Sequence, residues 1–91
     1  MDHWFDAYIV EIPHVQGGAP VVKGTRTSVR SVVLYLRTYA DDRAEVQRAL
    51  PHLSEIEIDA ALAFYRQNRT LIDADIERHE RARQQIRAAS A

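Results

Sequence analysis

The chain has 91 residues, a formal net charge of −1 at pH 7, 46% hydrophobic residues and 27% charged residues. These values are typical of one soluble globular domain with a modest core, and the near-zero net charge argues against a strong sequence-independent hold on nucleic acid. The chain has no cysteine, its four histidines lack the spacing of a helical zinc site, and neither a membrane-spanning apolar run nor a signal peptide is visible. We therefore expect a cytoplasmic protein that binds no metal or cofactor and contacts no membrane.

The N-terminal third predicts a small β-hairpin. Tyr8–Ile12 is rich in β-branched and aromatic residues, as strands are. A tight turn at Gly17-Gly18, where a positive φ costs little, would lead into a second short strand at Val21–Lys23. Pro20 fits such a strand only at its first residue or at an edge.

The glycine segment has a second interpretation, as a phosphate-binding loop. All three glycines of the chain lie between Gly17 and Gly24, directly before a periodic apolar segment. Their spacing matches neither GxxxxGK[ST] nor GxGxxG, and no long parallel strand precedes them. The hairpin is therefore the favoured interpretation.

Two short helices are predicted next. Ser28 is a candidate N-cap, followed by an apolar stripe at helical spacing: Val29, Val32, Val33 and Leu36. Asp41-Asp42 can cap a second helix over Arg43–Leu50, which Pro51 ends.

The last two predicted helices differ in character. Ser54 and Glu57 form a capping-box pattern that opens a third helix, whose apolar face holds Ile58, Ala61, Leu62, Phe64 and Tyr65. A junction at Asn68–Thr70 leads to a fourth helix from about Leu71 toward Ala89. Ile72 and Ile76 are apolar, and little follows them but charge and alanine, so the core-facing stripe of that helix fades near His79.

These elements predict a mainly α fold with a small N-terminal β-hairpin or strand. The three shorter helices suit a homeodomain-like or winged helix-turn-helix bundle, followed by a trailing C-terminal helix. We divide the chain into residues 1–70, the hairpin and helix-turn-helix domain, and residues 71–91, a C-terminal helix that could serve as a partner-binding tail.

Three sequence blocks resemble the family catalogued as domain of unknown function 433. They are Gly17-Gly18-x-Pro20-x-x-x-Gly24-Thr25-Arg26, Pro51-His52-Leu53-Ser54, and Ala60–Tyr65, in that order. The resemblance covers approximately residues 9–77. Thr27-Ser28 replaces the Ile-Pro usual in the family, and Tyr39–Asp42 lacks a glycine often found there.

The family looks like small proteins with a winged or homeodomain-like helix-turn-helix, and some members resemble VapB-type antitoxins paired with a PIN-like ribonuclease toxin. The resemblance therefore implies a DNA-binding antitoxin. Such a protein would dimerise, bind the operator DNA of its own operon, and neutralise a PIN-like ribonuclease toxin. We expect a homodimer through the strand at Tyr8–Ile12, which would otherwise be an exposed edge. The alternative is a protein-interaction module whose helix-turn-helix does not bind DNA. Enzymatic activity is the least supported class, because the serines are assigned to caps and no acid–base pair is evident.

Seven basic residues before the trailing helix are the candidate DNA contacts: Lys23, Arg26, Arg30, Arg43, Arg48, Arg66 and Arg69. Arg26 could equally be a structural residue that bonds carbonyls around the glycine turn. The third helix would be the recognition helix, yet its first turns carry Glu55, Glu57 and Asp59. These carboxylates could accept hydrogen bonds from cytosine, but complementing the helix dipole is the favoured interpretation.

Arg83 and Arg87 lie one turn apart on the trailing helix and are the candidate toxin-binding residues. A guanidinium there could reach the clustered carboxylates of a PIN-like metal site. Glu77 with Arg81, and Glu80 with Arg83, could instead stabilise a solvated helix that needs no partner.

Overall fold

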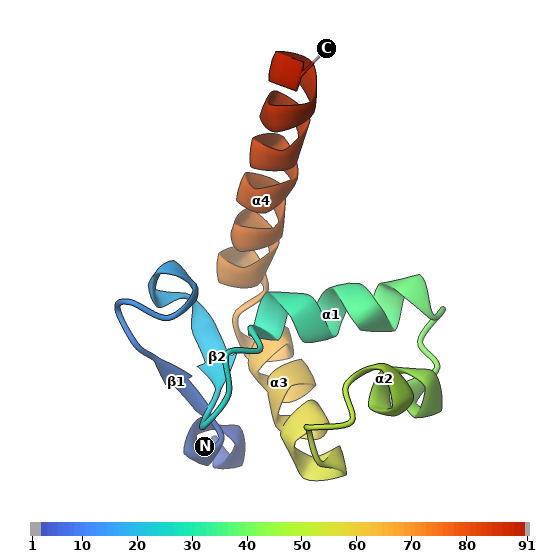
Figure 1. Ribbon diagram of the computed structural model, residues 1–91. Coiled ribbons are helices and arrows are strands. Elements are labelled where there is room, and N and C mark those ends of the chain that lie inside the picture. Colours follow the sequence, from blue (N-terminus) through green and yellow to red (C-terminus); the bar gives the residue numbers. More distant parts are fainter. Residues whose placement is uncertain (1–2, 91) are drawn as a thin grey trace.

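A computed structural model describes residues 3–90 of the chain, with side-chain environments for residues 3–87. The elements follow one another as η1 (Trp4–Ala7), β1 (Ile9–Glu11), η2 (Gln16–Gly18), β2 (Pro20–Val22), α1 (Val29–Thr38), α2 (Arg43–Ala49), α3 (Glu55–Gln67) and α4 (Arg69–Ser90). The fold is mainly α with a small N-terminal hairpin and a long C-terminal helix, as the sequence predicts (Figure 1).

The hairpin pairs β1 with β2 in an antiparallel register that places Ile9 opposite Val22 and Glu11 opposite Pro20. The amide of Lys23 donates to the carbonyl of Tyr8, so the Glu11–Pro20 pair falls at a non-hydrogen-bonded position of the ladder. A proline is tolerated there because no N–H is needed. The connection is longer than the predicted two-residue turn, since residues 12–19 lie between the strands.

Side chains cap three of the helices at the predicted positions. The Ser28 side chain accepts from the Ser31 amide, and Asp42 accepts from the first turn of α2. At α3, Ser54 and Glu57 form the complete capping box. Each cap satisfies backbone donors that the helix itself leaves unpaired. The starts of these helices are thus fixed by local sequence.

The core lies between α1, α3 and the hairpin. α1 and η1 both pack against α3, and Figure 1 shows α1 crossing α3. Val32, Ile58 and Leu62 are among the buried side chains at the helix contacts, while Phe5 and Val22 bring the N-terminal segment into the same cluster. The hairpin therefore belongs to the core structure, with β1 in contact with α3 and β2 in contact with α1.

α4 begins inside this core and then leaves it. Ile72 is fully buried and Asp75 is 4% exposed, whereas every residue from 77 to 87 is exposed. A helix of 22 residues is about 33 Å long, so roughly half of it extends past the body (Figure 1). We call residues 77–87 the arm.

Candidate binding groove at the base of α4

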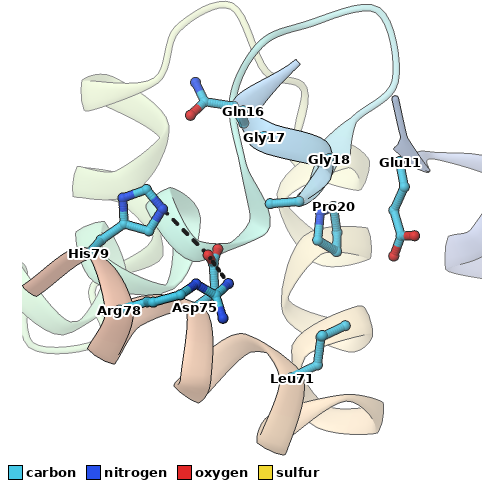
Figure 2. Close-up of a pocket in the computed structure, with 10 residues that line it drawn as sticks. Glu11, Gln16, Gly17, Gly18, Pro20, Leu71, Asp75, Arg78 and His79 are labelled. Carbon is cyan, nitrogen blue, oxygen red and sulfur yellow. Dashed lines mark hydrogen bonds and ion pairs between the residues drawn. The ribbon is translucent and has the colours of Figure 1, made fainter. Parts of the chain in front are cut away.

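A groove of about 580 Å³ lies where the glycine loop faces the first turns of α4 (Figure 2). The loop side is formed by residues 16–20 together with Glu11. The helix side is formed by Leu71, Asp75, Arg78 and His79. The most distinctive segment of the sequence therefore faces the helix that carries the arm.

Asp75 lines this groove and contacts three basic side chains. Its Oδ2 accepts a 2.7 Å hydrogen bond from Arg30 Nη1, and its Oδ1 accepts a 2.9 Å bond from Arg78 Nη2. His79 Nε2 lies 3.4 Å from the same Oδ1 (Figure 2). One buried carboxylate thus pairs inward with a buried guanidinium and outward with two exposed basic side chains.

Arg30 and Asp75 form a buried ion pair between α1 and α4. Their side chains are 10% and 6% exposed. Such a pair adds little net stability compared with apolar residues, but removing one partner leaves an uncompensated buried charge. The pair therefore specifies how α4 docks on α1. It also removes Arg30 from the set of surface cations, because its guanidinium serves the interior of the fold.

The glycine loop, residues 16–18, has the backbone conformation of a tight turn. Gln16, Gly17 and Gly18 have φ values of 51°, 65° and 86°. Consecutive residues in this region are accessible mainly to glycine, which accounts for Gly17-Gly18. Gln16 Nε2 donates a 3.0 Å hydrogen bond to the Arg26 carbonyl and so joins the loop to the segment after β2. These contacts describe a structural turn and fit the hairpin interpretation.

The segment after β2 connects with the turn between α2 and α3. Thr25 Oγ1 donates to the Val22 carbonyl, and Gly24 has a φ of 80°. Thr27 Oγ1 lies 2.7 Å from His52 Nε2. The residue that directly follows the glycine block therefore contacts the block at Pro51–Ser54, although the two are far apart along the chain.

The remaining candidate DNA contacts lie in three separate parts of the fold. Lys23 and Arg26 are exposed just after β2. On α2, Arg43 pairs with Asp59 at 2.6 Å, and Arg48 pairs with Glu45. The last two, Arg66 and Arg69, lie at the junction of α3 and α4 and are exposed. The structure does not bring the seven residues together on one surface.

The arm carries the candidate toxin contacts and the predicted intrahelical pairs. Arg83 Nη2 lies 3.3 Å from Glu80 Oε2, and Arg81 Nη2 lies 2.5 Å from Glu77 Oε1. Arg83 and Arg87 are both exposed. Among the described residues, no cluster of potential metal ligands is present, and none of their helices could cross a bilayer.

Sequence reasoning missed the Arg30–Asp75 pair. Its signal was nonetheless present, because each residue interrupts an apolar stripe. Arg30 lies between Val29 and Val32, and Asp75 follows Ile72 by one helical turn. A charge of each sign on two core-facing helices is a pattern that favours a buried pair.

The fold and groove define a class of small helical proteins with an N-terminal hairpin, a compact three-helix body and a projecting fourth helix. Residues 9–65 match the model of a family described as protein of unknown function (DUF433), and the chain belongs to this family. A crystal structure of a DUF433 member protein from Anabaena variabilis at 2.00 Å resolution is similar, with a TM-score of 0.70 and 31% sequence identity. The similarity covers 77% of this chain and 68% of that one. No curated protein matches.

Proposed function

We propose that the protein is a cytoplasmic, non-catalytic binding protein of the antitoxin type, whose arm binds and neutralises a PIN-like ribonuclease. One observation carries this proposal. α4 is held at its base by Ile72 and Asp75, yet every side chain from 77 to 87 is exposed. An isolated stretch of helix contributes little to the stability of its own domain. Its extension beyond the body is therefore best accounted for by a partner.

The chemistry of the arm fits an acidic site on that partner. Arg83 and Arg87 lie one turn apart and so project from the same face. Two guanidinium groups on one face can engage carboxylates through bidentate, charge-assisted hydrogen bonds. The Glu77–Arg81 and Glu80–Arg83 pairs favour the helical state before binding, which lowers the entropy lost on association.

Operator binding, the other half of the antitoxin hypothesis, receives less support. α3 would be the recognition helix, and bases would meet its N-terminal residues. Glu57 is used in the capping box and Asp59 is paired with Arg43, while Glu55 remains exposed. Carboxylates at that end would repel phosphates. These contacts favour the second candidate function, a protein-interaction module whose helix-turn-helix does not contact DNA.

We also propose a homodimer through β1. Within the described residues the sheet has two strands, and the alternation of the ladder turns the backbone groups of Ile9 and Glu11 away from β2. Trp4, in η1 before this strand, and Ile12, directly after it, are 41% and 37% exposed. A second copy that pairs with this edge would satisfy the backbone groups and cover the apolar side chains.

The proposal is tested by coexpressing the chain with the product of the adjacent gene and measuring the complex by size exclusion with light scattering. A gel shift with the promoter DNA of the chain's own gene then tests operator binding. A coeluting complex containing two copies of this chain, with a salt-sensitive gel shift, is expected of an antitoxin. Coelution without any shift selects the interaction module. If the neighbour does not coelute and the promoter does not shift, both functions are wrong.

A further inference from the structure

A second pocket, of about 330 Å³, lies where the C-terminal ends of α1 and α3 meet the start of α4. Its floor is apolar, with Val33, Leu36 and Leu62. Around the floor are Tyr65 and three basic residues: Arg37, Arg66 and Arg69. We call this the arginine pocket. It shares no residue with the groove at the base of α4 or with the arm.

Tyr65 holds two of the three guanidinium groups in place. Its Oη accepts a 2.9 Å hydrogen bond from Arg37 Nη2 and donates a 2.9 Å bond to Asp73 Oδ1. The guanidinium carbons of Arg37 and Arg69 lie 5.9 Å and 5.4 Å from the centroid of the ring, within cation–π range. Cations that are ordered in this way lose less entropy when they bind an anion.

Helix chemistry accounts for the placement of two of these arginines but not the third. Arg37 and Arg66 lie in the last turns of α1 and α3, where a cation complements the helix dipole. Arg69 is the first residue of α4, where the dipole disfavours a cation, and no acidic residue occurs in that turn. Residues that break a local rule occur preferentially at functional sites. Arg69 is therefore the side chain that points most directly to a ligand.

The residues that line the arginine pocket favour a ligand that has a compact anionic group next to an apolar group. Three arginines face one lining carboxylate, that of Asp41, so positive charge is in excess. An apolar floor suits an aliphatic side chain and gives a phosphate nothing to bond. Single-stranded nucleic acid needs a longer basic groove, and here Asp41 and Asp73 border the cluster.

We propose that the arginine pocket binds an acidic peptide segment of a partner protein. An aliphatic side chain of the segment enters the floor, and its flanking carboxylates pair with Arg66 and Arg69. The site is independent of the arm, so it stands whether or not the antitoxin function does.

The experiment measures fluorescence anisotropy of a labelled, end-blocked peptide, Glu-Glu-Leu-Glu-Glu, titrated with the full chain. Saturable binding is expected, and the double variant Arg66→Ala/Arg69→Ala weakens it about tenfold, equivalent to about 1.4 kcal/mol. Replacing the leucine by glycine, or the glutamates by glutamine, also weakens binding. Arg81→Ala, an exposed arginine on the arm, is the matched control and binds like the parent chain.

Several results would overturn the proposal. They are no binding up to about 1 mM chain, and equal binding by the parent and the double variant. Displacement of the peptide by an oligothymidylate at lower concentration would assign the pocket to nucleic acid. Loss of self-association in the double variant, measured by light scattering without peptide, would assign it to a second copy of the chain. Because all of the substituted arginines are exposed, unfolding does not confound these outcomes.

Discussion

Replacing Asp75 with asparagine lowers the free energy of unfolding by about 3 to 5 kcal/mol, the penalty typical of breaking a buried ion pair. Asparagine keeps the shape of the side chain but removes the charge that compensates Arg30, whose side chain is 10% exposed. Domains of this size have only about 5–15 kcal/mol of stability in total, so the variant would be close to unfolding at 37 °C. Urea denaturation followed by circular dichroism measures the change.

Asp73→Asn is the matched control, two residues away on the same helix. The Asp73 side chain is 52% exposed, and it lies 3.4 Å from an Arg37 that is 50% exposed. An exposed pair contributes about 0–1 kcal/mol, so this variant should remain near the parent. If the two variants lost equal stability, the Arg30–Asp75 pair would not be what docks α4. Replacing both members by apolar residues, as Arg30→Met/Asp75→Leu, should recover most of the loss.

Truncating Ile72 to alanine lowers stability by about 2–5 kcal/mol, because it removes a fully buried side chain and leaves a cavity. Ile72 is the residue of α4 that lies within the buried core cluster, and Ile76 packs against that cluster from the next turn. A loss of 1 kcal/mol corresponds to a fall of roughly 4–8 °C in Tm for a domain of this size. Differential scanning calorimetry measures the shift.

Leu71→Ala provides the comparison, since Leu71 is the neighbouring residue and is 47% exposed. It should change stability by no more than about 0.5 kcal/mol, as most surface substitutions do. Equal losses at the two positions would mean that the base of α4 is not part of the cooperative core. The arm would then lack the rigid attachment on which the proposed function depends.

The local features of the fold were predictable because short-range physics determines them. Ser28, Asp42 and Ser54 cap helices where polar residues precede an apolar stripe. The apolar stripe of α4 also fades after Ile76, and this pattern predicted that the rest of the helix would lie outside the core. The length of the hairpin loop was not predictable, because the turn residues Gly17-Gly18 are compatible with both short and long connections.

Arg30 and Asp75 each lie among apolar residues in the sequence, but the sequence does not specify which carboxylate an arginine pairs with. Arg30 and Arg43 were both predicted to be surface cations near helix starts. One is buried against Asp75, and the other pairs with Asp59 on α3. Which carboxylate an arginine pairs with depends on the angle at which the helices cross. The spacing of residues along the chain does not determine that angle. The arginine pocket shows the same limit, since it gathers Arg37 and Arg69 from separate helices around one tyrosine.

We propose that the arm binds its partner through the face that carries Arg83 and Arg87. The most direct measurement is coelution of the adjacent gene product with the full chain carrying Arg83→Glu/Arg87→Glu, compared with Arg81→Glu. Arg81 is two residues from Arg83 and so projects from nearly the opposite side of the helix. We expect the double variant to fold normally but to lose the partner, while Arg81→Glu retains it. If both variants retained the partner equally, Arg83 and Arg87 would not be the residues that bind it.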